Sequence, residues 1–304
     1  MPNEGPARSQ LRDCTSELEP VSPAIVQRDV RRALAEDIGS GDITSDLLPA
    51  EARARARIVT RDAAILCGCD WFAECFHAID AAVRIEWRAR EASPVAAGAV
   101  LCLVEGSARA LVTAERTALN FLQTLSATAT VTARYVQAVH GTRARILDTR
   151  KTLPGLRDAQ KYAVRAGGGC NHRMGLYDAV LIKENHIAAM GSISAAVARA
   201  RLLHPKVLVE TEVETFAELR EALAAQADRI LLDEFDLDEL AQAVRETAGK
   251  VPLEVSGGVA LDRVRAIADT GVDYISIGAL TKHVQAVDLS MRIELTEQET
   301  MRGS

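Results

Sequence analysis

The sequence predicts an α/β protein in which a small α+β module precedes a barrel of repeated βα units. Three observations support this class. Short apolar runs alternate regularly with helical stretches after Gly141, the pattern before Gly141 is irregular, and nearly every later run ends in a polar residue or Gly. The 304 residues are 48% hydrophobic but only 4% aromatic, which predicts an aliphatic core in one large domain or two ordinary ones.

The N-terminal part, residues 24–140, is expected to form one domain. Residues 1–23 contain several prolines among polar residues and lack the apolar stretch of a signal peptide, so we expect a disordered leader. Residues 24–38 have a helical pattern that ends at two glycines. Short strands are predicted in the following apolar runs: 56–60, 63–67, 83–87 and 100–104.

A second helix is predicted from an N-cap at Thr113 towards His140, with Glu115 in its first turn. Arg116 then also lies in the first turn, where a cation opposes the helix dipole. A bound anion would offset that cost, and an ordinary surface arginine is the alternative.

Residues 141–287 are expected to form the barrel, and the segment at about 288–300 to pack back on the N-terminal domain. Six buried strands are predicted: 144–148, 179–183, 207–213, 229–233, 253–256 and 274–277. Doubly wound sheets show the same alternation of strands and helices. We favour a barrel because functional groups of barrels lie at the carboxyl ends of the strands, where polar residues recur here. These residues are Asp148, Thr149, Arg150, Lys151, Lys183, Glu212, Asp233, Ser256, Gly257, Gly258 and Gly278.

The strand at 207–213 alternates with period two, and its even positions are expected to face the barrel interior. That would bury Glu210 and Glu212, which then need cations or a metal ion. An internal salt bridge, for example to Lys183, is the alternative to a functional site.

Residues 143–183 contain nine Lys or Arg and three Asp, a net charge of +6 in a chain whose net charge is −6. A solvated surface is the ordinary interpretation of such a run. The strand-end positions instead predict a cationic pocket for a small, multiply anionic substrate. Lys183 then has three interpretations: an exposed strand-end residue, a Schiff-base lysine or a partner of an anion.

Two glycine clusters bear on anion binding. Ser256-Gly257-Gly258 precedes a helix predicted from Leu261, and bare backbone N–H groups at a helix start bind phosphate. A simple turn is the alternative. Residues 167–169 are equally ambiguous and could be only a flexible loop.

Composition also excludes or disfavours other classes. The net charge of −6 disfavours nucleic acid as a partner. No apolar run reaches the ~20 residues that a membrane span needs, so we expect a cytoplasmic protein without membrane contact. The six cysteines include no CxxC pair and no His at zinc spacing.

Several long motifs resemble those of the quinolinate phosphoribosyltransferases, also called nicotinate-nucleotide pyrophosphorylases (carboxylating). They cover the chain from about residue 25 to residue 295, and TRKT–PGLR at 149–157 and GGGxNHRxGLxD at 167–178 are the most specific. The other matching segments are 35–46, 114–130, 181–187, 256–258 and 276–281. Departures from the family pattern are Leu153, Gln160, Glu184 and Glu234, and none removes a residue with an assigned role.

The resemblance implies an N-terminal α/β sandwich, an open TIM-like barrel and a homodimer, with higher oligomers left open. It implies that Arg116 reaches the site of the neighbouring subunit. Substrate carboxylates and phosphates would be held by Thr149, Arg150, Lys151, His172, Arg173 and Lys183. Ser256, Gly257, Gly258 and Gly278 would hold the 5′-phosphate. Glu212 and Asp233 would lie near the ribose and Mg²⁺, with indirect or substrate-mediated metal contact.

The implied reaction is a pentosyl transfer in NAD biosynthesis. Phosphoribosyl pyrophosphate and quinolinate would give nicotinate mononucleotide, pyrophosphate and CO₂, with Mg²⁺ and no organic cofactor. Lys151, Lys183, Glu212 and Asp233 are the expected catalytic residues. Three alternatives stay open: a paralogue of the same fold that acts on another base, a barrel lyase with Lys183 as a Schiff base, and a non-catalytic anion-binding protein.

Overall fold

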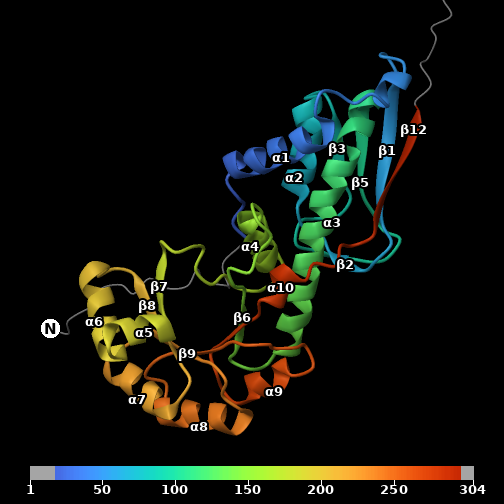
Figure 1. The fold of residues 1–304 in the computed structure, drawn as a ribbon. Coiled ribbons are helices and arrows are strands. Elements are labelled where there is room, and N and C mark those ends of the chain that lie inside the picture. The colour runs from blue at the N-terminus through green and yellow to red at the C-terminus, as the bar shows by residue number, and fades with distance from the viewer. Residues whose placement is uncertain (1–17, 296–304) are drawn as a thin grey trace, which may run out of the picture. The chain divides into compact units, whose positions relative to one another are not determined.

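The computed structural model describes residues 18–295, and they form two compact units (Figure 1). The N-terminal unit contains residues 18–131, 153–167 and the chain from His283. The barrel unit contains residues 132–152 and 168–282. The boundary therefore falls inside one long helix, whereas the sequence pattern placed it at Gly141. Most of the expected leader and the segment after Leu295 lie outside the described residues.

The N-terminal unit is built on a four-stranded antiparallel sheet in the order β12-β1-β5-β3. Its strands are β1 (Arg53–Thr60), β3 (Arg84–Trp87), β5 (Val100–Ser107) and β12 (Leu289–Leu295). In β1, exposed arginines alternate with buried apolar residues, as a half-buried strand requires. The C-terminal segment pairs with β1, from Ala54 opposite Leu295 to Thr60 opposite Leu289.

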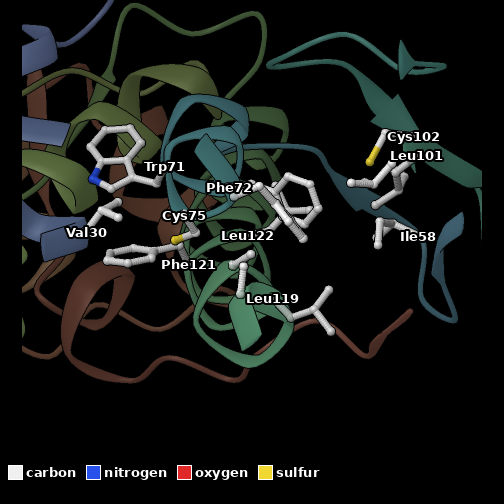
Figure 2. Packing of buried hydrophobic residues seen from close by; sticks show 14 of the residues in the cluster. Val30, Ile58, Trp71, Phe72, Cys75, Leu101, Cys102, Leu119, Phe121 and Leu122 are labelled. Atoms are coloured by element: carbon white, nitrogen blue, oxygen red, sulfur yellow. The ribbon is translucent and has the colours of Figure 1, made fainter. Parts of the chain in front are cut away.

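The core of this unit lies between the sheet and three helices. They are α1 (Pro23–Ile38), α2 (Cys69–Ile79) and α3 (Ala108–Ala138). Figure 2 shows Phe72 between Leu122 of α3 and the strand residues Ile58 and Leu101. Leu18 and Val21, which the sequence assigned to the leader, also pack against this core.

Distant residues bear on two helices of this unit, at the start of α2 and within α3. The backbone N–H groups of Gly68 and Cys69 donate to the carboxylate of Glu91, at 2.8 and 3.1 Å, which caps α2. The N-cap predicted at Thr113 is wrong because α3 begins at Ala108, and the Thr113 hydroxyl donates to Asp42 Oδ2 at 2.8 Å. Arg116 is therefore not in the first turn, and the dipole argument for an anion there fails.

The smaller elements of this unit are the 3₁₀ helix η1 (Ser45–Leu47), the strand pair β2 (Ala64–Ile65) and β4 (Pro94–Val95), and α4 (Arg157–Ala166). Within the described residues, no helix of either unit is long and apolar enough to cross a membrane.

The barrel unit contains a parallel sheet of six strands in the order β7-β8-β9-β10-β11-β6. The strands are β6 (Arg145–Leu147), β7 (Ala179–Ile182), β8 (Leu208–Val213), β9 (Arg229–Leu232), β10 (Leu253–Val255) and β11 (Tyr274–Ser276). All six were predicted. Cys170 forms an isolated parallel β-bridge with Leu147 of β6. Within residues 18–295, no strand pairing joins β6 to β7. The open barrel expected from the sequence is thereby confirmed.

Helices follow the strands and lie in an arc around the sheet (Figure 1). They are α5 (Glu184–Met190), α6 (Ile193–Leu203), α7 (Phe216–Ala224), α8 (Leu237–Thr247), α9 (Val264–Asp269) and α10 (Ala279–Lys282). Ser192, Thr215 and Asp236 cap α6, α7 and α8 with their side chains. The helix predicted from Leu261 begins at Val264 instead, so residues 256–258 are not at a helix start.

Candidate active site at the strand ends of the barrel unit

The carboxyl ends of the six parallel strands carry the polar residues that the sequence singled out. Because the strands are parallel, their carboxyl ends lie at the same edge of the sheet. Twelve of the thirteen predicted site residues belong to the barrel unit: Thr149, Arg150, Lys151, His172, Arg173, Lys183, Glu212, Asp233, Ser256, Gly257, Gly258 and Gly278. Arg116 is the exception, since it is an exposed residue of α3 in the N-terminal unit.

Lys183 and Glu212 form an ion pair between the ends of β7 and β8. The Lys183 side chain is 43% exposed and that of Glu212 only 10%. The internal salt bridge considered for this strand is thus present. Because the Lys183 side chain is partly exposed, it can bind an anion that enters from solvent. The nearly buried Glu212 carboxylate compensates the charge of Lys183 when no anion is bound.

Arg173 and Arg150 place two positive charges close together. Burial and the nearby Arg150 guanidinium both lower the pKa of Arg173. Arg173 Nη1 donates to the carbonyl oxygen of Ala179, at 3.1 Å, where β7 begins. The planar donors of guanidinium groups suit carboxylates and phosphates.

Asp148 fixes the loop that carries His172 and Arg173. It is fully buried at the end of β6, and its Oδ1 accepts from the backbone N–H of His172 at 2.9 Å. Its Oδ2 accepts from Asn171 Nδ2 at 2.5 Å. The sequence marked Asp148 only as one of several strand-end residues, and the structure gives it this anchoring role.

A buried ionic network occupies the interior of the sheet below this loop. We call it the barrel network; its members are His172, Glu210, Arg229, Glu254 and Ser276. His172 Nε2 lies 2.9 Å from Glu210 Oε2 and 3.5 Å from Glu254 Oε1. Arg229 Nη1 lies 2.9 Å from Glu254 Oε2 and 3.8 Å from Glu210 Oε1.

The remaining contacts of the network come from β11. The Ser276 hydroxyl donates to Glu254, and the Arg229 guanidinium stacks 4.8 Å from the ring centre of Tyr274. Sequence reasoning expected Glu210 to face inward, which is correct, but it missed Arg229, Glu254 and Ser276. The available signal was a charged residue at an inward position of a short, otherwise apolar strand.

Protonation in the network follows from burial and mutual charge. Burial and the Glu210 carboxylate raise the pKa of Glu254 to about 7. Burial opposes ionisation of Glu210 as well, but the hydrogen bond and charge of His172 outweigh it and lower the pKa of Glu210. Burial alone would lower the pKa of His172, yet the two glutamates raise it.

Two glycines permit close approaches at the strand ends. A Cβ on Gly278 would lie 2.8 Å from Lys151 Cδ and 3.6 Å from Thr149 Oγ1. A Cβ on Gly257 would lie 3.2 Å from Asp233 Oδ1, and Gly257 has a φ of +97°. The first contact brings the β6 and β11 loops together, and the second brings the β9 and β10 loops together.

Comparison with known families matches both parts of the chain. Residues 128–292 match the family described as quinolinate phosphoribosyl transferase, C-terminal domain, and residues 42–126 match its N-terminal domain. The chain belongs to the quinolinate phosphoribosyl transferase family. The resemblance inferred from the motifs is confirmed.

Individual relatives support the same assignment. The chain is 42% identical over 264 residues to a probable nicotinate-nucleotide pyrophosphorylase [carboxylating] of Bacillus subtilis, with 86% of this chain and 91% of the relative covered. It is 42% identical over 271 residues to the nicotinate-nucleotide pyrophosphorylase [carboxylating] of Mycobacterium leprae, with 86% and 95% covered. A solved structure of the nicotinate-nucleotide pyrophosphorylase from Francisella tularensis has a TM-score of 0.89 at 48% identity, covering 92% of this chain and all of that one.

The departures from the family motifs have identifiable surroundings. Leu153 and Gln160 contact each other, since the Leu153 N–H donates to Gln160 Oε1 at 2.7 Å. Glu234, beside Asp233, has a φ of +60°, a conformation that Asn adopts more readily than Glu. None of these three departures removes a strand-end charge.

Proposed function

We propose that this protein transfers the phosphoribosyl group of phosphoribosyl pyrophosphate to quinolinate with loss of CO₂, which yields nicotinate mononucleotide in NAD biosynthesis. The observation that carries the proposal is the group of cations in the barrel unit: Lys183 is 43% exposed beside Glu212 at the ends of β7 and β8, and Arg173 is anchored on the Ala179 carbonyl oxygen with Arg150 nearby. Several cations of this kind suit a substrate with adjacent carboxylates. The name of the family, quinolinate phosphoribosyl transferase, points to the same substrate.

Binding and orientation are the main tasks of the cationic residues. The pyridine nitrogen of quinolinate is itself the nucleophile, so the reaction needs no strong general base. Arg150, Lys151, Arg173 and Lys183 would hold the substrate carboxylates and the pyrophosphate. His172, expected to join them, has both ring nitrogens near protein groups: Nε2 beside Glu210, and Nδ1 accepting from the Arg173 N–H at 2.7 Å.

Glu212 and Asp233 are proposed to stabilise the positive charge that develops on the ribose ring. Negative groups aimed at an oxocarbenium-like centre lower its energy, as in glycosyl transfer generally. The half-buried Asp233 and the nearly buried Glu212 are oxygen donors of the kind that Mg²⁺ prefers, so they fit the ion through water or substrate. When bound, Mg²⁺ neutralises the charge of the departing pyrophosphate.

The 5′-phosphate is proposed to bind at Ser256, Gly257, Gly258 and Gly278. The bare backbone of these loops supports this role, because a side chain at Gly278 would displace Lys151 and one at Gly257 would crowd Asp233. After transfer, the positively charged ring nitrogen stabilises the carbanion formed when CO₂ leaves. The carbanion takes up one proton from solvent at that carbon to give nicotinate mononucleotide, while the protein holds the second carboxylate.

The lyase alternative is disfavoured by the environment of Lys183. A Schiff-base lysine must lose its proton to attack a carbonyl group. Lys183 instead forms an ion pair with the Glu212 carboxylate. Covalent trapping of a carbonyl substrate on Lys183 by borohydride would instead support the lyase function.

A homodimer with Arg116 shared between subunits is proposed as well. Its support is the exposure of Arg116 on α3 of the N-terminal unit, whereas the other predicted site residues belong to the barrel unit. Mixed Arg116→Ala and Lys183→Ala proteins are expected to regain activity through hybrid dimers. No recovery despite demonstrated subunit exchange would refute a shared site. The expected cytoplasmic location stays a prediction that cell fractionation can test.

The decisive assay uses purified protein, Mg²⁺, phosphoribosyl pyrophosphate and quinolinate labelled at the carboxylate next to the ring nitrogen. Release of labelled CO₂ is expected. Turnover with nicotinate instead of quinolinate would contradict the proposal. Glu212→Gln and Asp233→Asn are both expected to slow turnover strongly, and near-normal rates in both would remove their assigned role.

A further inference from the structure

The barrel network is more elaborate than the packing of the sheet requires. Glu210 and Glu254 are fully buried, and the Arg229 side chain is only 3% exposed. Buried ion pairs cost much of their attraction in lost hydration, and well-packed apolar residues often stabilise a fold equally well. Stability therefore gives a weak account of these charges, and their position relative to the site gives a better one.

Glu254 contacts network members from three other parts of the barrel unit. Arg229 comes from β9 and Ser276 from β11. His172 comes from the loop that follows the β-bridge between Cys170 and Leu147. Its carboxylate is thus fixed on two sides by the neighbouring strands. The third side faces the His172 ring.

The His172 ring is held at both of its nitrogens. Nε2 faces the two glutamates, and Nδ1 accepts the backbone N–H of Arg173 at 2.7 Å. In the neutral form of the ring, an accepting Nδ1 carries no proton, so the single ring proton lies on Nε2 and points to the carboxylates. The orientation of the ring therefore determines the direction of the Arg173 N–H.

Arg173 is in turn held at its far end by the Ala179 carbonyl oxygen, with Arg150 nearby. A chain of contacts leads from Glu254 through His172 to the backbone N–H of Arg173, whose guanidinium is one of the two proposed to hold the substrate carboxylates. A rotation of the imidazole would tilt the start of the Arg173 side chain. Small displacements of a bidentate group cost affinity because both of its hydrogen bonds must align.

We propose that Glu254 is a positioning residue that sets the direction of Arg173 through His172 and thereby determines affinity for an aromatic dicarboxylate. The proposal rests on the proposed function for the identity of that substrate. It assigns Glu254 no contact with substrate. It deepens the site by adding a residue from the strand that leads into the phosphate-binding loop.

The test measures binding rather than turnover. Dissociation constants for quinolinate and, separately, for phosphoribosyl pyrophosphate with Mg²⁺ are determined by calorimetry for the unsubstituted protein and for Glu254→Leu. The expected result is quinolinate binding weakened by about tenfold, since one charge-assisted contact to His172 is lost. Binding of phosphoribosyl pyrophosphate should change by less than about twofold.

Two further variants separate positioning from loss of structure. Glu254→Gln keeps the shape and an acceptor for His172, so it should recover most of the quinolinate affinity. Leu253→Ala shortens a buried side chain on the opposite face of the same strand, and it should weaken the fold without affecting either ligand selectively. If Glu254→Leu does not fold, the comparison of Glu254→Gln with Leu253→Ala still applies, and ¹⁵N chemical shifts of His172 report whether its tautomer changes.

Unchanged quinolinate affinity in Glu254→Leu, an equal loss for both ligands, or the same selective loss in Leu253→Ala would overturn the proposal. Failure of the proposed function has a different signature: the unsubstituted protein would bind quinolinate and release no CO₂. Absence of quinolinate binding by the unsubstituted protein would overturn both.

Discussion

Both sheets of this protein pair Arg with Glu, but they do so in opposite surroundings. In the N-terminal unit, Arg55 of β1 contacts Glu105 of β5 at 2.5 Å, with side chains 56% and 40% exposed. In the barrel unit, Arg229 contacts Glu254 at 2.9 Å, with side chains 3% and 0% exposed. Water screens the first pair and compensates either partner if the other is removed. The second pair is surrounded only by protein groups. Removing one partner of this pair should therefore affect stability and function much more than removing one partner of the exposed pair.

The largest expected effect comes from removing the buried cation. Arg229→Ala leaves Glu210 and Glu254 without the guanidinium that lies 3.8 and 2.9 Å from them. Loss of one partner of a buried ion pair typically costs about 3–5 kcal/mol of unfolding free energy. Urea unfolding followed by circular dichroism measures it, with Arg55→Ala as the control. Equal midpoints for the two variants would mean that burial does not distinguish the pairs.

The contrast also explains which residues the sequence revealed. Period-two alternation in residues 207–213 showed that Glu210 faces inward, because the information is local to one strand. Arg229 and Glu254 each stand alone in a short apolar run. Their significance depends on β9 lying beside β10, a pairing that no local pattern encodes.

Errors in the predicted helix starts have the same origin. Thr113 has the composition of an N-cap, but its hydroxyl is engaged by Asp42, 71 residues away, and the helix starts earlier. The start of α2, a helix that the sequence analysis did not predict, is capped by Glu91, which follows the helix in sequence. The positions of the barrel strands and the polar residues at their ends could be predicted from the sequence, whereas the tertiary partners of individual side chains could not.

A second prediction concerns the pH dependence of the buried network. The pKa of Glu254 is raised from an ordinary value of 4.5 to about 7, so the folded state binds this proton more tightly than the unfolded state. Stability through Glu254 is therefore greatest below about pH 4.5 and declines as the pH rises towards 7. His172, with a raised pKa, acts in the same direction at higher pH, while Glu210, with a lowered pKa, acts oppositely at low pH.

Glu254→Gln removes the first of these titrations. The free energy of unfolding, obtained from urea titrations between about pH 5 and pH 8, should then fall less steeply than in the unsubstituted protein. The expected difference over this range is on the order of 2 kcal/mol. Arg229 and Ser276 also face this carboxyl but do not titrate in that range. Parallel pH profiles for the two proteins would show that Glu254 does not ionise there. The exposed Glu105→Gln should leave the profile unaltered.

Ser276→Ala is expected to have an intermediate effect. The Ser276 hydroxyl donates to the buried Glu254 carboxylate and lowers its pKa. Its removal should cost about 1.5 kcal/mol when Glu254 is ionised and less when it is protonated. The stability loss should therefore grow with pH, and the midpoint of the Glu254 titration should move upward. A loss that is independent of pH would indicate a packing effect of the missing oxygen rather than a hydrogen bond to the carboxylate.

The smallest expected effect is that of Arg55→Ala on the exposed sheet face. Exposed ion pairs contribute about 0–1 kcal/mol, because water screens the attraction and two long side chains lose freedom. A double-mutant cycle with Glu105→Ala isolates the pair, and its coupling energy should shrink further at about 1 M salt, where the Debye length is about 3 Å. A cycle between Arg229 and Glu254 should respond little to salt, since ions do not reach the interior. A salt-insensitive coupling at Arg55, as large as that at Arg229, would mean that proximity rather than burial determines the strength of these pairs.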